Sequence, residues 1–215
     1  MNRRVKRVAG ILLAAGTSTR MGKTKQLLPF GEKTLIERVL VEALNSELDK
    51  VVLVLGYQAV EIKKIINPVS PQPKLSIIEN RQFKQCISSS IISGLSEIEN
   101  THDHVMILLG DMPFIHRDLI NLLIRRYLKS GLWIGAIKGQ DRPAHPMIFS
   151  RQLYPELLIL QGDVGARVLF TKYSDQVCLI QPEGLYNDRD IDTPEDYAGF
   201  QISLKNQVDR QNNEY

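Results

Sequence analysis

Short apolar runs alternate along the chain with segments in which apolar residues recur at helical spacing. The runs are Val8–Ala14, Val51–Leu55, Leu75–Ile78, Val105–Leu109, Trp133–Ile137 and Val177–Ile180. Several of them are apolar at nearly every position, which is typical of strands covered on both faces, as in parallel sheets. The runs therefore predict the strands of a largely parallel sheet.

The segments between the runs have the periodicity of amphipathic helices. They predict helices over 34–44, 58–66, 88–98 and 118–128. Strands that alternate with helices indicate an α/β fold with right-handed crossovers. We therefore predict a single three-layer α/β/α domain over residues 1–205, with a mostly parallel, Rossmann-like sheet, followed by a polar and frayed tail over 206–215.

The composition is that of a globular protein that dissolves in water. Its 215 residues are enough for one well-buried domain and too few for two ordinary ones. The net charge is only +3, no apolar run is long enough to cross a bilayer, and the basic residues near the start are typical of a solvated chain end. Cys86 and Cys178 form no C-x-x-C pair, which favours a reducing compartment. We therefore predict a cytoplasmic protein that binds neither nucleic acid nor membrane.

Two local features have simple interpretations. The basic start followed by an apolar run resembles a secretory signal peptide, but cleavage there would remove the first predicted strand. His102 and His104 come directly before a predicted strand, and we expect them in an exposed loop.

The first apolar run ends in a turn of small residues that is followed by several cations. The turn begins at Ala15 and Gly16, and Arg20, Lys23 and Lys25 come after it. Small residues let backbone N–H groups approach an anion, and consecutive N–H groups in a turn form an anion-binding concavity. The turn therefore predicts a site for the phosphates of a nucleoside triphosphate. A plain strand–turn connection without a ligand is the structural alternative.

The same turn almost matches the P-loop, G-x-x-x-x-G-K-[ST]. The spacing from Gly16 to Gly22 is one residue too long, and Thr17 stands where the first glycine should be. Because loop length decides how the backbone curls around phosphates, the spacing disfavours an ordinary P-loop but not phosphate binding.

A second candidate site follows the run Val105–Leu109. Gly110 and Asp111 come at its end, and Pro113 turns the chain away from the sheet. Ligands of α/β sheets bind at the carboxyl ends of strands, and a carboxylate there is suited to Mg²⁺ or Mn²⁺ beside phosphate oxygens. An Asp that caps a turn is the structural alternative, but the nearby phosphate turn favours the metal.

Five carboxylates are concentrated in residues 188–197. A Thr-Pro pair followed by two acidic residues predicts a helix start, which accounts for the last two carboxylates. Asp190 and Asp192 precede that helix and alternate as in an extended segment. Either could complete a metal site with Asp111, and we favour Asp192.

Three motifs together resemble the MobA-like nucleotidyltransferases, which include molybdenum-cofactor guanylyl- and cytidylyltransferases. The motifs are L-A-A-G-x-S-x-R-M-G with a following lysine (13–25), L-G-D-M-P (109–113) and D-I-D-T-P-E-D (190–196). The resemblance extends from about Val8 to Phe200 and implies the nucleotide-diphospho-sugar transferase type of fold. The first motif is shared with many sugar-phosphate and isoprenoid nucleotidyltransferases, so it indicates the superfamily alone.

Further matches resemble the cytidylyltransferase branch. They are Asn80, Ser88–Ser90, Gly94-Leu95, His145–Phe149 and Gly162–Arg167. Ala15 in place of a glycine goes, within this family, with cytidine rather than guanine nucleotides. The chain departs from the branch at Cys86-Ile87, where Gly-Met is usual, and at Ala144, where a glycine is common. These departures weaken the inference about the substrate more than the inference about the type of reaction.

The resemblance implies transfer of CMP from CTP to the phosphate of the molybdenum-pterin cofactor, with a molybdenum hydroxylase as the acceptor enzyme. The implied nucleotide contacts are Ala14, Ala15, Gly16, Arg20, Lys25, Asn80, Ser88 and Asp111. Of these, Arg20, Lys25 and Asp111 are the implied catalytic residues, and Asp111 with Asp192 would bind Mg²⁺ or Mn²⁺. Candidates on the pterin side are Ser89, His145 and Asp163, each of which has a structural alternative as a helix cap, strand residue or i,i+4 partner of Arg167.

Other functions share these motifs. A nucleotidyltransferase for a sugar phosphate or another phosphorylated alcohol would have the same core motif. A non-catalytic chaperone that carries the molybdenum cofactor would keep the fold. The altered Cys86-Ile87 pair is the feature of this chain that supports this alternative. A P-loop ATPase is disfavoured by the loop length.

Overall fold

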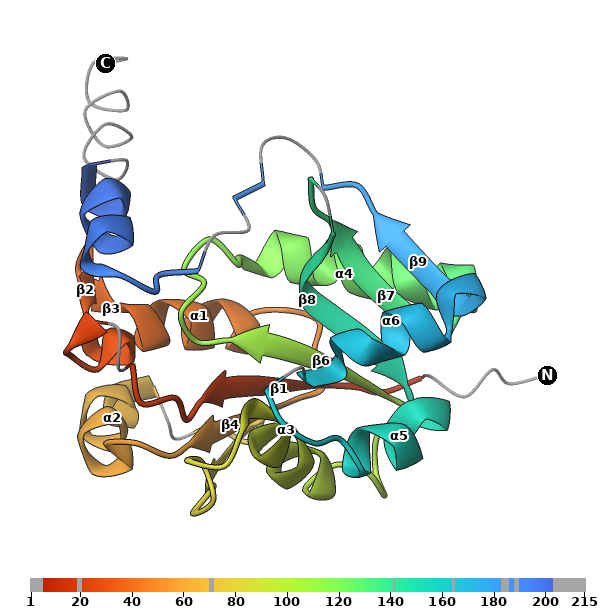
Figure 1. The fold of residues 1–215 in the computed structure, drawn as a ribbon, viewed down its shortest axis with the longest axis horizontal. Coiled ribbons are helices and arrows are strands. Elements are labelled where there is room, and N and C mark those ends of the chain that lie inside the picture. Colours follow the sequence, from red (N-terminus) through yellow and green to blue (C-terminus); the bar gives the residue numbers. More distant parts are fainter. Residues whose placement is uncertain are drawn as a thin grey trace.

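The computed structural model describes residues 6–18, 21–69, 72–140, 142–163, 165–182, 186–187 and 190–202. At its centre lies a seven-stranded sheet with the order β5-β4-β1-β6-β8-β7-β9 (Figure 1). Its strands are β1 (Val8–Ala14), β4 (Lys50–Leu55), β5 (Leu75–Glu79), β6 (His104–Leu109), β7 (Ile134–Lys138), β8 (Pro143–Ser150) and β9 (Val177–Ile180). Neighbouring strands are parallel except that β8 is antiparallel to both β6 and β7. The predicted, mostly parallel sheet is therefore confirmed.

Helices cover both faces of this sheet (Figure 1). One face packs against α1 (Leu35–Leu44), α2 (Ala59–Ile66) and α4 (Arg117–Ser130), and the other against α3 (Ile87–Ser96), α5 (Tyr154–Leu158) and α6 (Val168–Lys172). Side chains of β1 alternate between the two cores, with Leu12 in one and Ile11 and Leu13 in the other. Both faces are buried, which explains why β1 is apolar throughout. The three-layer α/β/α class is confirmed, and no described helix is long and apolar enough to cross a membrane.

Local signals explain where helices begin and end. The Thr34 hydroxyl accepts from the Glu37 amide, and the Glu37 carboxylate accepts from the Thr34 amide at 2.8 Å, so α1 starts with a capping box. Helix α4 ends at Gly131, whose φ of 71° is a conformation that glycine adopts at little cost. Short 3₁₀ helices join these elements: η2 (Lys25–Leu27), η3 (Asn67–Val69), η4 (Arg151–Leu153), η5 (Gly165–Arg167) and η6 (Ser174–Gln176).

A small hairpin of β2 (Pro29–Phe30) and β3 (Lys33–Thr34) stands beside the sheet. The helical residues 194–202 lie next to it (Figure 1). Phe30 shares a separate apolar cluster with Leu35, Ile191 and Phe200, and Tyr197 Oη donates to Pro29 O at 2.6 Å. The C-terminal segment is thereby fastened to the molecule close to the end of β1.

His102 and His104 are buried, so the predicted exposed loop is wrong. Each is 6% exposed, and His104 is the first residue of β6. Its Nδ1 lies 3.0 Å from the Tyr127 hydroxyl, and its Nε2 has no hydrogen-bond partner among the described residues. The strand begins one residue earlier than the apolar run, and Tyr127 of α4 covers that position, which a local pattern does not reveal.

Replacing His104 by phenylalanine is expected to make the stability of the folded protein less sensitive to acidic pH. Burial, with a smaller effect of Lys6, lowers the pKa of His104 from 6.5 to about 4. Between these values the unfolded chain binds a proton here and the folded chain does not, so stability falls as the pH drops through this window and is unaffected above it. The full effect is up to about 3 kcal/mol. Urea unfolding of the wild type and the variant at about pH 7 and about pH 4.5 measures this effect. An equal loss of unfolding free energy in both proteins between the two pH values would contradict the expectation.

Candidate active site

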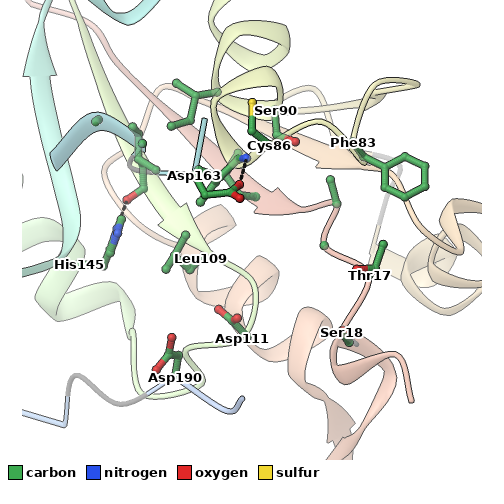
Figure 2. Close-up of a pocket in the computed structure, with 18 of the residues that line it drawn as sticks. Thr17, Ser18, Phe83, Cys86, Ser90, Leu109, Asp111, His145, Asp163 and Asp190 are labelled. Carbon is green, nitrogen blue, oxygen red and sulfur yellow. Dashed lines mark hydrogen bonds between the residues drawn. The ribbon is translucent and has the colours of Figure 1, made fainter. Parts of the chain in front are cut away.

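A cavity of about 760 Å³ lies at the carboxyl ends of the central strands. Its walls come from the end of β1 and the turn after it, the loop that leads into α3, the end of β6, part of β8, and residues of the 163–167 and 190–192 segments. These segments are far apart in the sequence. The segments that follow β1, β5 and β6 meet because these parallel strands end at the same edge of the sheet, where the antiparallel β8 begins. Figure 2 shows this cavity with side chains from all of these regions.

The turn after β1 lines the cavity and positions Lys25. Ala15 O accepts from the Tyr57 amide at 3.2 Å, and Gly16 is exposed at the cavity wall. Ser18, whose φ is 54°, accepts from the Lys25 amide at 3.1 Å through its hydroxyl and donates to Gln26 Oε1 at 3.3 Å. The turn thus folds back on the start of η2, which brings Lys25 into the cavity. Ala14 is buried behind this wall, and Arg20 lies outside the described residues.

Three carboxylates gather at the end of β6. Asp111, Asp190 and Asp192 each offer an oxygen, and these oxygens all lie within 4.8 Å of one another. Ile191 lies between the two C-terminal acids, and its amide donates to Asp111 O at 3.2 Å. The Ile191 side chain is fully buried in the apolar cluster that contains Phe30. Asp111 and Asp190 face the same space in Figure 2. The geometry brings together Asp111 and Asp192, as predicted, and adds Asp190.

The Lys25 ammonium group sits among these carboxylates. Its Nζ donates to Asp192 Oδ1 at 2.9 Å and also pairs with Asp111 Oδ2. Burial alone would lower the pKa of Lys25, but Asp111 and Asp192 together raise it above its usual value. The pKa of Asp190 is raised, first by burial and then by the two neighbouring carboxylates. Repulsion from the other two acids therefore contributes to this shift in spite of the lysine.

The acidic cluster fits a divalent cation. Carboxylate oxygens are the ligands that Mg²⁺ and Mn²⁺ prefer, and one ammonium group neutralises only part of the charge of three carboxylates. Asp111, Asp190 and Asp192 are the residues that would bind the ion, since their oxygens converge.

The polar residues at the start of α3 are bonded to each other. Asn80 is 5% exposed, its Nδ2 donates to the Ser89 and Ser90 hydroxyls at 2.8 and 3.0 Å, and its Oδ1 accepts from the Gln82 amide. Ser88 is fully buried and donates to Gly162 O at 2.7 Å. This network shapes the loop into α3, and of its hydroxyls that of Ser90 belongs to a cavity-lining residue.

His145 and Asp163 line the cavity on the side of β8 and η5. His145 Nδ1 lies 3.4 Å from Ile107 O, and burial, with nearby Arg167, lowers the pKa of His145 to about 4. The imidazole is therefore neutral near pH 7. Asp163 Oδ1 accepts from the Ile87 amide at 3.1 Å (Figure 2). Arg167 also lines the cavity, where burial and nearby Arg142 lower its pKa.

Several cavity residues were not singled out from the sequence: Phe83, Lys84 and Gln85, which lie in the loop that leads into α3. The available signal was positional, because this loop follows a strand at the carboxyl edge. Ile87, Gly165 and Ala166 also line the cavity, and the sequence offered them only as parts of family motifs. Cys86 also lines the cavity, so the departure from the usual Gly-Met pair falls on the binding surface.

Fold and site together define an α/β enzyme in which a turn of small residues, the Lys25 ammonium group and a carboxylate cluster share one cavity. Residues 10–177 match the model of the MobA-like NTP transferase domain. The chain belongs to this family and is a nucleotidyltransferase.

Three curated relatives show how varied such proteins are. The purine catabolism protein PucB of Bacillus subtilis is 31% identical, and the nicotine blue oxidoreductase of Paenarthrobacter nicotinovorans is 29% identical; each alignment covers 87% of this chain and 93% of the relative. The molybdenum cofactor cytidylyltransferase of Escherichia coli is 26% identical, with 87% and 92% covered. These names refer to different activities, so sequence identity of this degree does not identify the substrate of this chain.

Solved mycobacterial structures share the fold. The homolog of Mycobacterium tuberculosis Rv0371c from Mycobacterium sp. strain JC1 superposes with a TM-score of 0.78 at 30% identity, covering 94% of this chain and 98% of the other. Rv0371c of Mycobacterium tuberculosis, in a complex with manganese, gives a TM-score of 0.75 at 25% identity, with 91% and 98% covered.

Proposed function

We propose that this enzyme transfers CMP from CTP to the phosphate of the molybdenum-pterin cofactor and releases pyrophosphate. The observation that carries the proposal is the convergence of Asp111, Asp190, Asp192 and Lys25 beside the turn at Gly16, within one cavity. The product would then be passed to a molybdenum hydroxylase.

The chemistry is an in-line displacement at phosphorus. An oxygen of the acceptor phosphate attacks the α-phosphorus of CTP, a new P–O bond forms, and the bond to the bridging oxygen of pyrophosphate breaks. Such a transfer needs positioning and neutralisation of charge rather than a protein nucleophile. A divalent ion bound by the three carboxylates would neutralise phosphate charge and orient the reacting oxygens.

The residues of the chain supply the remaining charge and geometry. The turn at Ala15 and Gly16 offers backbone N–H groups to the triphosphate, and Arg20 and Lys25 add positive charge. The Lys25 ammonium would then exchange a carboxylate for a phosphate oxygen, because Lys25, Asp111 and Asp192 all line the cavity proposed for the triphosphate. We further propose Asn80 and Ser88 on the nucleotide side, where they shape the loop against the base, and Ser89 and His145 on the pterin side.

The choice of cytidine rests on Ala15 and on the cytidylyltransferase relative. Ala15 lines the cavity and is 5% exposed, so a methyl group occupies space that a glycine would leave open. A relative from Natranaerobius thermophilus that is named a probable molybdenum cofactor guanylyltransferase is, however, 27% identical to the chain, close to the 26% of the cytidylyltransferase. The base therefore needs a direct test.

A thermal-shift panel of the four nucleoside triphosphates, each with Mn²⁺ and with Mg²⁺, is expected to show stabilisation by CTP. A ligand at one hundred times its dissociation constant stabilises by about 2.7 kcal/mol, roughly 5–10 °C for a protein of this size. The Ala15→Gly variant is the matched comparison and should gain a shift with GTP. A shift with GTP alone in the wild type would contradict the cytidylyl assignment.

The same panel separates the alternatives. No shift with any triphosphate would favour a chaperone for the cofactor, the alternative suggested by Cys86-Ile87 in the cavity wall. If CTP is bound, pyrophosphate release in the presence of the pterin, compared with a set of sugar phosphates, decides the acceptor.

A further inference from the structure

Two hydrogen bonds join the start of α3 to the segment that carries Asp163. The Ile87 amide, at the first residue of α3, donates to Asp163 Oδ1 at 3.1 Å (Figure 2). One residue further on, Ser88 Oγ donates to Gly162 O at 2.7 Å. The first amides of a helix have no partner within the helix, so Asp163 supplies an acceptor that α3 itself lacks. Its negative charge also suits the positive end of the helix dipole.

Side-chain packing keeps the same two segments together. Gly165 has a φ of 60°, and a Cβ at this position would lie 3.4 Å from Ile87 Cγ2. Glycine adopts this φ readily, which lets the segment run close to α3. The next residue, Ala166, is 6% exposed and shares an apolar core with Ile91 of α3.

The loop that leads into α3 also packs close to the turn after β1, at Ala15 and Gly16. The loop into α3 contains Phe83, and a Cβ at Gly56 would lie 2.6 Å from Phe83 Cβ and 2.8 Å from Ala15 O. The loop therefore packs against the turn after β1 by way of Gly56. In Figure 2, Phe83 lies on the side of Thr17, and His145 lies on the opposite side of the cavity.

We infer that Asp163 is a positioning residue for the nucleotide wall: by accepting from the Ile87 amide it fixes the 83–87 loop relative to the turn at Gly16. The inference rests on the proposed function only in taking the β1 side of the cavity as the nucleotide side. It assigns Asp163 an action through α3 by way of a backbone contact, in contrast to a direct pterin contact; the family resemblance allows either a pterin or a backbone contact. The two roles differ in one respect, since a pterin contact has no effect on nucleotide binding when no pterin is present.

Asparagine and alanine at position 163 separate hydrogen bonding from charge. The Asp163→Asn side chain keeps an oxygen that can accept from the Ile87 amide, whereas Asp163→Ala removes the acceptor. Asp175→Ala is the matched control, because Asp175 is an exposed carboxylate of η6 and does not line the cavity.

The first measurement is amide hydrogen exchange on the ligand-free, full-length proteins. Peptides that cover 83–91 are expected to exchange at least about fivefold faster in Asp163→Ala and within about twofold of the wild type in Asp163→Asn and Asp175→Ala. Should Asp163→Ala not fold, Ser88→Ala removes the other hydrogen bond and is expected to raise exchange in the same peptides. Unchanged exchange in these variants would overturn the inference.

The second measurement is calorimetric titration with CTP and Mn²⁺ in the absence of any acceptor. Asp163→Ala is expected to raise the dissociation constant about fivefold, and Asp163→Asn to restore it to within about twofold. A wild-type dissociation constant in Asp163→Ala, or equal weakening in both variants, would overturn the positioning role. If the wild type binds no CTP, the proposed function fails, while the exchange data still decide whether Asp163 orders the loop.

Discussion

Asp111→Asn is expected to lower the rate of pyrophosphate release by about 10³-fold or more while leaving the melting temperature within about 4 °C of the wild type. The amide keeps the shape of the side chain but removes a charge from the cluster with Asp190 and Asp192, so the affinity for a divalent ion should fall. Folding should change little, because Lys25 retains its bond to Asp192 at 2.9 Å.

Glu195→Gln is the matched control for this variant. Glu195 belongs to the same C-terminal segment, is exposed and does not line the cavity, so the same loss of charge there should leave turnover unchanged. Pyrophosphate release and Mn²⁺ titration measure the two effects. Turnover within tenfold of the wild type in Asp111→Asn would show that the metal assignment is wrong.

Lys25→Met is expected to give a protein whose stability depends on added metal. Without Lys25, three carboxylates face one another at short range, and loss of one partner from a desolvated ion pair is strongly destabilising. Because the site borders the cavity, we expect a cost of about 2 kcal/mol, or roughly 4–8 °C, in the presence of EDTA. Saturating Mn²⁺ should remove most of this difference, since the ion replaces the missing ammonium charge. Turnover should fall by about 10²-fold even with metal, since the triphosphate loses a cation.

The control for Lys25→Met is Lys63→Met, which removes the exposed pair of Lys63 with Glu79. Exposed pairs contribute little to stability, so its melting temperature should be close to that of the wild type with EDTA and with Mn²⁺ alike. Thermal unfolding of the three proteins under both conditions provides the comparison. An equal shift by Mn²⁺ in Lys25→Met and the wild type would mean that the ammonium group and the ion do not share a site.

Six of the seven strands of the sheet were predictable because their signal is local; β8 was not among the predicted runs, since prolines and polar residues interrupt its apolar pattern. The predicted bounds of β1 match those observed, because a strand buried on both faces is apolar residue by residue. The bounds of β9 also match, although this edge strand is only partly buried. The short β2–β3 hairpin and the five-residue α5 and α6 were missed, because they are too short for a periodicity to appear. The carboxyl-edge rule points to Gly16 and Asp111 from the sequence alone.

The partners of the polar residues were not predictable in the same way. The bond between Lys25 and Asp192 spans 167 residues of sequence, and nothing in either local pattern says that the two groups meet. The sequence therefore predicts only phosphate as the partner of Lys25, whereas in the structure its ammonium group pairs with the carboxylates of Asp111 and Asp192. The sequence likewise does not indicate that the amide group of Asn80, a residue predicted at the nucleotide, is bonded to Ser89 and Ser90. Burial and long-range pairing decide such cases, and both depend on the whole fold.

The bond between the Ile191 amide and Asp111 O has a consequence for the order in which the molecule matures. Asp190 and Asp192 come after β9, the last strand of the central sheet, so none of the strands depends on the segment that carries these two carboxylates. The acidic cluster is therefore completed last, when Ile191 and Phe200 dock on the hairpin next to it. A nascent chain therefore carries the turn at Gly16 before it carries the full set of carboxylates.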